Sequence, residues 1–252
     1  MLRGAFTDWV DTLRAGVDRN LAEPGPHARF YTAKGEPGYF FGDYCNWQRI
    51  PEYRDFVENS SLGEVAAGLM GARRAVFFHE HVLVKEPGTR EPTPWHHDYP
   101  YYSVDCDQNA SFWIPLDEVS ADVCPEFIRG SHQWGKWYVP TRFTGQEWER
   151  GQEPEGLERI PDIEAARADY DIVSFDLAPG DAVIFDFLTV HGAPPNASAD
   201  RRRRAFSARV LGDNARWAER SGQTSPPFPE LAGLMHHGDA LDGRPEFPVI
   251  HS

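Results

Sequence analysis

Apolar residues recur every three or four positions in the N-terminal part of the chain. The series is Phe6, Trp9, Val10, Leu13, Val17 and Leu21. This spacing places the side chains along one side of a helix, so it predicts an amphipathic helix. A second helix is expected to begin at Ser61 and to continue to about Met70, because Ser61-Leu62-Gly63-Glu64 has the sequence of a capping box.

Farther along the chain, the pattern becomes typical of strands. Runs of β-branched and aromatic residues bounded by turn residues predict strands over 75–85, 109–116, 125–128 and 202–211. Ala178-Pro179-Gly180-Asp181 is a turn sequence, and it predicts a hairpin of two further strands, 171–177 and 182–187. We expect residues 138–170 to form a long excursion with a helix near 163–168.

No repeat or break in composition marks a domain boundary. We therefore expect one domain over residues 1–252, with a helical part (1–72), a core (73–212) and an irregular tail rich in proline and glycine (213–252). Helices followed by many short strands predict a mainly β fold with flanking helices packed on one sheet. The expected core is a double-stranded β-helix, the jelly roll of cupin-like proteins.

The composition argues against several classes of protein. A formal net charge of -14 disfavours nucleic acid or an anionic membrane as the main partner. No apolar run approaches the roughly 20 residues of a membrane span, and the N-terminus lacks the apolar segment of a secretory signal. Cys45, Cys106 and Cys124 form no paired motif and suit a reducing compartment. We therefore expect a cytoplasmic protein.

One short motif has the chemistry of a metal site. His96 and Asp98 lie two positions apart, and on an extended strand this spacing places both side chains on one face. His97 then points to the other face and is not expected to bind metal. Imidazole nitrogen and carboxylate oxygen suit Fe(II) and leave coordination positions open. The motif alone is weak evidence, because His237-Gly238-Asp239 repeats it in the irregular tail.

A third candidate ligand and an anion-binding residue follow downstream. His191 comes after the predicted strand 182–187 and before a Gly/Pro turn, so it lies at a strand end. On the next strand, one face carries Arg203, Ala205, Ser207 and Arg209. A buried arginine must meet an anion, and a guanidinium binds a carboxylate through two hydrogen bonds. This order of residues is typical of a mononuclear iron site that also holds a keto-acid.

Together these motifs resemble those of a known family. Thr93-Pro94-Trp95-His96-His97-Asp98 resembles the iron motif of the phytanoyl-CoA dioxygenase family of Fe(II)/2-oxoglutarate oxygenases. Further landmarks of that family follow in its order, at Phe112–Asp117, Glu126–Gly135, Pro179–Asp181 and Leu188–Gly192. The resemblance covers roughly residues 1 to 212.

The resemblance implies roles for particular side chains. His96, Asp98 and His191 would bind the iron. Arg203 would bind the distal carboxylate of 2-oxoglutarate, with Arg204 in its place if the register is shifted by one. Further contacts to this co-substrate are implied for Ser207, Lys85, His81 and Trp113. Core packing explains Trp113 equally well, and His81 taken alone is more typical of an ordinary buried histidine.

The resemblance also implies an activity. Iron, 2-oxoglutarate and O2 would oxidise an unactivated C–H bond of a small metabolite by hydroxylation, with release of succinate and CO2. Related halogenases have a small residue at the position of Asp98, so the carboxylate favours hydroxylation. Desaturation, epoxidation, epimerisation and ring closure stay open. The alternatives are a non-catalytic module that binds iron or the keto-acid on the same fold, and a cupin-like metalloprotein without co-substrate.

The sequence does not identify the substrate. Some aromatic residues either line a pocket or belong to the core: Tyr44, Trp47, Tyr99, Tyr101 and Tyr102. His79 either meets substrate or is an ordinary buried histidine, and Arg209 binds either a substrate anion or a buried acid. No basic cluster other than 201–204 suits the phosphates of CoA, so a CoA thioester stands beside a natural product or a lipid-like metabolite.

Two features depart from the family pattern. Members usually have a further segment with a first strand ahead of the position of Leu2, so we expect either a missing edge strand or a start farther upstream. The stretch Val123-Cys124-Pro125-Glu126 replaces a more usual Asn-Gly turn, which leaves the shape of this loop open.

Overall fold

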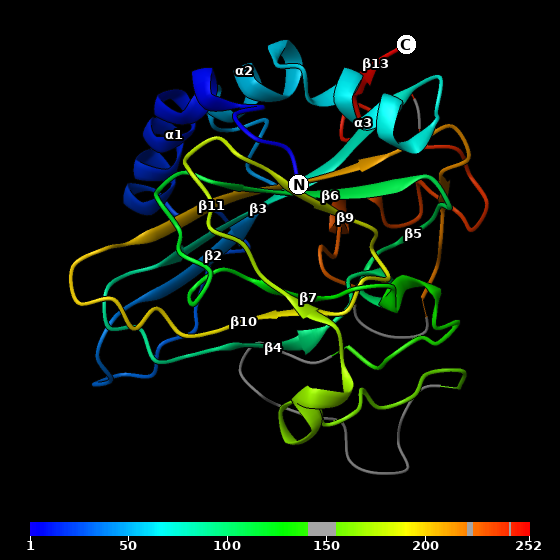
Figure 1. Ribbon diagram of the computed structural model, residues 1–252. Helices are drawn as coiled ribbons and strands as arrows, with labels where there is room; N and C mark the ends of the chain where they lie inside the picture. The colour runs from blue at the N-terminus through cyan, green and yellow to red at the C-terminus, as the bar shows by residue number, and fades with distance from the viewer. Residues whose placement is uncertain (141–154, 221–223, 242) are drawn as a thin grey trace.

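Two antiparallel sheets face each other in the computed structural model, which describes residues 1–140, 155–220, 224–241 and 243–252. Three helices pack on the outer face of the larger sheet, and the smaller sheet lies on the opposite side (Figure 1). The fold is therefore the jelly roll with flanking helices that the sequence predicts.

The larger sheet contains the long strands of the core. Its spatial order is β1 (Arg29–Phe30), β2 (Phe40–Tyr44), β3 (Ala75–Lys85), β11 (Arg203–Leu211), β6 (Asn109–Pro115) and β9 (Val183–Phe185), and β13 (Val249–His251) also pairs with β3. The predicted strands 75–85, 109–116 and 202–211 are confirmed with small shifts at their ends. β1 and β2 were not predicted, and they come from the part expected to be helical.

The smaller sheet is built from short strands. Its order is β4 (Thr93–His96), β10 (His191–Ala193), β7 (Glu126–Ile128) and β8 (Ile172–Val173). A separate pair is formed by β5 (Val104–Asp105) and β12 (Arg216–Trp217). In the ladder between β10 and β4, His191 lies opposite His96. Strand pairing therefore brings together two histidines that are far apart in the sequence.

The hairpin predicted around residues 178–181 is wrong. β8 pairs with β7 in the smaller sheet, whereas β9 pairs with β6 in the larger one, so the turn connects the two sheets.

The N-terminus holds this turn: the Asp181 carboxylate accepts a hydrogen bond of 2.7 Å from the backbone N–H of Gly4. Gly180 has a φ of +84°, and a Cβ there would lie 2.5 Å from the Cα of Thr7. The glycine is thus required by this close approach.

The helices are α1 (Val10–Ala22), α2 (Pro51–Asn59) and α3 (Leu62–Met70), with the short 3-10 helix η1 (Thr7–Trp9) ahead of α1. α1 and α3 confirm the two predicted helices, whereas α2 was not predicted. The capping box is not formed, because Ser61 makes no side-chain cap. Instead, the hydroxyl oxygen of Ser60 accepts a hydrogen bond of 3.2 Å from the N–H of Leu62.

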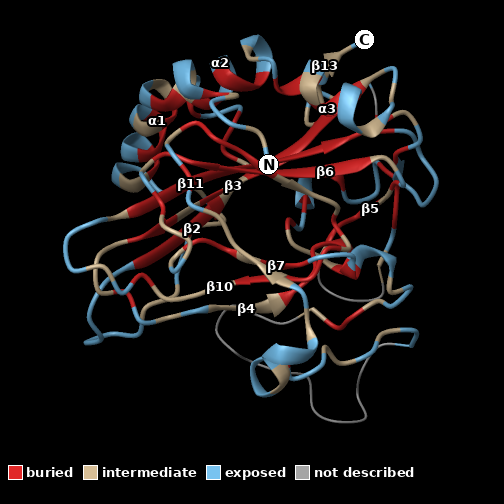
Figure 2. Cartoon of the chain, in the orientation of Figure 1, coloured by how far each residue is buried: buried red, intermediate tan, exposed pale blue. Residues whose placement is uncertain are grey.

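The main core lies between the helices and the larger sheet. The Phe206 ring packs against Tyr53 and Phe56 of α2, with centroid distances of 5.0 and 5.3 Å. Figure 2 shows this continuous buried layer through β3, β6 and β11. Because side chains alternate across a strand, the neighbours of Phe206 on β11 face the other way, into the space between the two sheets.

The C-terminal segment is more ordered than the irregular tail that was expected. It contains β12, β13 and the 3-10 helix η5 (Pro229–Leu231), and its Trp217, Phe228 and Phe247 belong to a second hydrophobic cluster. The other 3-10 helices are η2 (Tyr99–Tyr101), η3 (Ser131–Gln133) and η4 (Glu164–Asp169). η4 stands where a helix was predicted near 163–168, and residues 141–154 of the predicted excursion lie outside the described residues.

Two glycines of α3 form a matched pair for testing how β13 docks. A Cβ on Gly63 would lie 2.3 Å from the carbonyl oxygen of Ile250, whereas a Cβ on Gly68 would have no atom within 4 Å. We expect Gly63→Ala to lower the free energy of unfolding by about 1–3 kcal/mol through overpacking. Gly68→Ala should raise it by about 0.5–1 kcal/mol. Urea unfolding measures both, and equal effects would contradict the packing of β13 on α3.

Candidate metal centre

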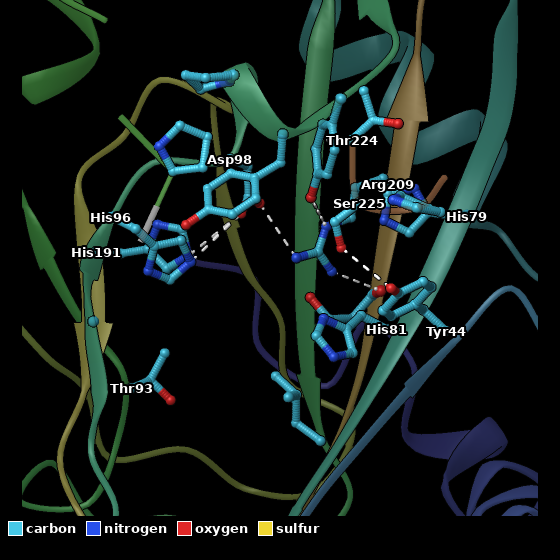
Figure 3. Close-up of a pocket in the computed structure, with 18 of the residues that line it drawn as sticks. Tyr44, His79, His81, Thr93, His96, Asp98, His191, Arg209, Thr224 and Ser225 are labelled. Carbon is cyan, nitrogen blue, oxygen red and sulfur yellow. Dashed lines mark hydrogen bonds and ion pairs between the residues drawn. The ribbon is translucent and has the colours of Figure 1, made fainter. Parts of the chain in front are cut away.

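Three buried side chains converge between the two sheets. His96 is the last residue of β4, His191 is the first of β10, and Asp98 immediately precedes η2. Their donor atoms lie within 4.8 Å of one another. The Oδ1 of Asp98 is 3.6 Å from Nε2 of His96 and 4.0 Å from Nε2 of His191 (Figure 3). The structure thus brings together the three candidate ligands that the sequence motifs suggested.

The position of Asp98 corrects one step of the sequence argument. The strand ends at His96, and the backbone of Asp98 is helical, with φ of −77° and ψ of −32°. Alternation along an extended strand therefore does not orient the carboxylate. The turn into η2 orients it instead, and the N–H of Asp98 donates a hydrogen bond of 2.8 Å to the carbonyl oxygen of Phe187.

Backbone carbonyls determine how the two imidazoles face the centre. Nδ1 of His96 lies 2.8 Å from the carbonyl oxygen of Pro94, and Nδ1 of His191 lies 2.9 Å from that of Thr189. Each Nδ1–H therefore donates to a carbonyl, which leaves the lone pair on Nε2. Two imidazole nitrogens and one carboxylate oxygen form the donor set that binds Fe(II) with open positions, so these residues fit an iron ion.

The second oxygen of Asp98 is bound by the protein. Oδ2 accepts hydrogen bonds from Arg209 at 3.2 Å and from the Ser111 hydroxyl at 3.3 Å. Arg209 also donates to the hydroxyl of Tyr102 at 2.9 Å. Burial alone would raise the pKa of Asp98, but Arg209 and the two imidazoles hold it below its usual range. Asp98 is therefore ionised, and Arg209 pairs with a buried acid, one of the two roles left open for it.

His97 turns away from the centre. Its Nε2 accepts a hydrogen bond of 2.8 Å from the N–H of Tyr138. The second His-x-Asp copy is also remote from the centre: its Asp239 is exposed and accepts a hydrogen bond of 2.8 Å from the N–H of His236. Neither His97 nor the tail copy belongs to the cluster of three donors.

We expect the metal-free protein to lose stability in mild acid. Burial lowers the pKa of His191 to about 3 and that of His97 to about 4, from an ordinary value of 6.5. Between pH 6.5 and these lowered pKa values, the two histidines are protonated in the unfolded chain but neutral in the folded chain. The free energy of unfolding therefore falls as the pH is lowered from 6.5 toward 4. Urea-unfolding midpoints measure the effect. A midpoint that rises with acidification would contradict the burial of these rings.

Two buried basic side chains lie next to each other in the same cavity as the three donors. Arg203 of β11 pairs in register with Lys85 of β3. Arg203 donates to the carbonyl oxygens of Val123 and Pro194, and Lys85 donates to those of Glu91 and Pro194 at 2.8 and 3.2 Å. Within the described ranges, neither basic side chain forms an ion pair with a carboxylate. Burial lowers the pKa of Arg203 to about 10, and burial together with Arg203 lowers that of Lys85 to about 6.

Arg204 faces the opposite side of β11. Its Nε and Nη2 donate to the two carboxylate oxygens of Asp117 at 3.0 and 2.7 Å. Arg204 therefore already has an acid partner, and Arg203 is the arginine of the pair that faces the cavity.

A cavity of about 1350 Å³ connects the three donors with Arg203 and Lys85. Ser207 lies in its wall, and it pairs in register with His81 on β3 and with Trp113 on β6, which also line the cavity. The aromatic residues of the sequence analysis separate into two groups. Tyr44, Tyr101 and Tyr102 line the cavity, whereas Trp47 and Tyr99 do not line it and pack in the hydrophobic clusters.

Several residues of the site were missed by sequence reasoning. Phe127 and Phe185 pack against the ring of His191, with centroid distances of 5.9 and 4.7 Å, and Ser225 reaches the cavity from the tail. The loop with the unusual sequence 123–126 also contributes, because the carbonyl of Val123 binds Arg203. Periodicity predicted the strand of Phe127, but nothing in the sequence indicated that the tail returns to the site.

The structure bears on two further expectations. The three cysteines, which form no paired motif in the sequence, are free thiols. In the described part of the chain, no helix has the length and apolar character needed to cross a membrane.

Comparisons with known proteins agree with this geometry. The model of the family "Phytanoyl-CoA dioxygenase (PhyH)" matches residues 1–205. No curated protein matches the chain by sequence.

Among solved structures, the chain is similar to the epimerase SnoN in complex with Fe3+, alpha ketoglutarate and nogalamycin RO. The TM-score is 0.76, with 21% identity over 99% of this chain and 93% of that one. SnoK, a non-heme alpha ketoglutarate dependent carbocyclase from nogalamycin biosynthesis, has a TM-score of 0.70, with 24% identity over 96% of this chain and 87% of that one. EctD from S. alaskensis, in its apoform, has a TM-score of 0.60, with 17% identity over 82% of this chain and 69% of that one. These similarities show a shared fold.

Proposed function

Because the chain belongs to the phytanoyl-CoA dioxygenase family, we propose that it is an oxygenase that uses Fe(II), 2-oxoglutarate and O2. The observation that carries the proposal is one cavity with a buried set of three metal donors and a buried Arg203 beside Lys85, neither of which has a carboxylate partner among the described residues. A metal ion alone does not need a buried arginine. A keto-acid that chelates the metal presents its second carboxylate away from it, and that carboxylate needs a cation.

Each group then has a defined task. His96, His191 and Oδ1 of Asp98 hold the iron, which, with 2-oxoglutarate and O2 bound, supplies the oxidation of a C–H bond and the release of succinate and CO2. Arg203 donates two hydrogen bonds to the distal carboxylate of the keto-acid. The co-substrate also contacts Ser207, Lys85, Trp113 and His81, which line the cavity around Arg203.

For the reaction, we propose hydroxylation of an unactivated C–H bond in a small metabolite. Asp98 supplies the third protein ligand, which leaves no position for a halide beside the keto-acid and O2. The cavity is large enough for a second molecule beside the keto-acid. Because the solved structures with this fold include a carbocyclase and an epimerase, the test has to separate these outcomes from hydroxylation.

A panel of metabolites incubated with the purified chain, Fe(II) and 2-oxoglutarate in air tests the proposal. A substrate is expected to raise the release of succinate, and mass spectrometry of its product should show the gain of one oxygen atom. Loss of two hydrogen atoms would instead indicate ring closure or desaturation, and an unchanged mass would indicate epimerisation. Binding of 2-oxoglutarate without succinate release for any compound would contradict the oxygenase and favour a non-catalytic binding module.

A further inference from the structure

The cavity contains polar side chains that the proposed iron and keto-acid functions do not use. Tyr44 of β2, His79 of β3 and Ser225 of the C-terminal segment form this group, which we call the hydroxyl subsite. The hydroxyl oxygens of Ser225 and Tyr44 are 3.3 Å apart. Figure 3 shows the subsite on one side of the cavity and the three metal donors on the other. The subsite therefore faces the space where a substrate would lie.

His79 supplies an independent sign of a missing partner. Its side chain is almost fully buried, and its Nδ1 has no hydrogen-bond partner among the described residues. The ring packs edge-on against Tyr102, with a centroid distance of 5.0 Å. A buried polar atom without a partner costs free energy, and such atoms in native structures call for an explanation such as a bound molecule.

The three side chains of the subsite offer hydrogen bonds but carry no charge. Burial and the nearby Arg209 lower the pKa of His79 well below its usual value, so the imidazole is neutral. Arg209 is paired with Asp98. Arg220, a partly exposed arginine that also lines the cavity, is paired with Asp105 at 2.8 Å and donates to two backbone carbonyls. Arg29 also lines the cavity, but it is exposed to solvent. An anionic group bound at the three side chains of the subsite would lose its hydration without gaining a cation from them.

Flat apolar surfaces also belong to the wall of the cavity. The rings of Tyr101 and Trp137 line it, together with Pro100 and Pro226. Aromatic faces stack on flat rings, and hydroxyl groups beside them satisfy ring oxygens. The combination fits a ring that carries several oxygen atoms and no charge.

We propose that the hydroxyl subsite binds the hydroxyl or carbonyl oxygens of an uncharged ring in the substrate. The inference rests on the proposed function only in taking the three donors as the reacting centre. Two kinds of ring share this chemistry, a sugar and a hydroxylated aromatic ketone. An acyl-CoA, a phosphate ester and a carboxylic acid are disfavoured as the group that occupies this subsite.

Two matched pairs of probes test the proposal by calorimetric titration of the full-length chain without iron or keto-acid. Phenyl β-glucoside is compared with phenyl β-glucuronide, and danthron, a neutral dihydroxyanthraquinone, with rhein, which adds one carboxylate. We expect the neutral member of at least one pair to bind about tenfold more tightly than its acid. The pair that shows the preference distinguishes the sugar from the aromatic ketone.

Variants connect this preference to the subsite. Tyr44→Phe removes one hydroxyl and His79→Phe keeps a ring, and each should weaken the preferred neutral probe about tenfold. Arg204→Met, on the opposite face of β11, should leave the affinity unchanged. Circular dichroism checks that each variant is folded.

Three results would overturn the proposal: acids that bind as tightly as their neutral partners in both pairs, no binding of any probe, or unchanged affinity in both subsite variants. Keto-acid binding to the iron-loaded chain is measured separately. If the keto-acid does not bind while the neutral probe does, the proposed function is wrong and the proposal for the subsite is retained.

Discussion

Replacing His96 by alanine is expected to weaken Fe(II) binding by more than a hundredfold and to abolish the formation of succinate. Loss of groups that only orient metal ligands typically costs about 10–100-fold in affinity, so loss of a ligand itself should exceed that range. The Nε2 of His96 is one of three donor atoms, and the structure provides no substitute in the described cluster. Equilibrium dialysis with Fe(II) under anaerobic conditions measures the effect.

His97→Asn is the matched control for this prediction. His97 is the adjacent residue and is also buried, but its Nε2 binds the N–H of Tyr138 and does not face the centre. The variant should retain iron and lose only part of its stability, which thermal unfolding records. Equal iron binding by His96→Ala and the wild-type chain would contradict the assignment of the ligands.

Replacing Arg203 by methionine is expected to weaken 2-oxoglutarate binding strongly while iron binding is retained. Loss of one partner of a buried, hydrogen-bonded charge pair costs about 2–5 kcal/mol, which corresponds to roughly thirtyfold to a few thousandfold in Kd. Lys85 lies beside Arg203 in the ladder and keeps part of the positive charge, so binding should be weakened and not fully lost. Titration of the iron-loaded chain with the keto-acid gives the two dissociation constants.

Arg204→Met separates the two neighbouring arginines. It removes the two hydrogen bonds to Asp117 on the other face of β11, so it should lower the free energy of unfolding and leave keto-acid affinity unchanged. The opposite pattern, with Arg204→Met impairing keto-acid binding and Arg203→Met leaving it intact, would mean that the arginine register is shifted by one.

The parts of the fold that depend on local periodicity were predictable from the sequence. Alternation along 202–211 placed Arg203 and Ser207 on one face and Phe206 on the other, and the strand has this arrangement. Turn residues do not carry the same information. Pro179 and Gly180 indicate that the chain reverses, but whether the flanking strands pair depends on the partners available in both sheets.

The candidate site was predictable only in part, because a turn and long-range packing position some of its residues. The motif residues could be named, but the orientation of Asp98 comes from the turn after β4, which the two-residue spacing does not specify. His79 was noted without a definite role, and Ser225 was not found at all. Ser225 reaches the cavity because the C-terminal segment packs through Trp217, Phe228 and Phe247, and such long-range packing leaves no periodic pattern.

The central claim is that one cavity holds Fe(II) and 2-oxoglutarate together. Anaerobic titration of the Fe(II)-loaded chain with 2-oxoglutarate, followed by admission of air, tests it most directly. We predict a visible metal-to-ligand charge-transfer band that saturates with one equivalent of keto-acid, decays in air with formation of succinate, and is absent in His96→Ala. Iron binding without any such band, or a band that persists in His96→Ala, would contradict the claim.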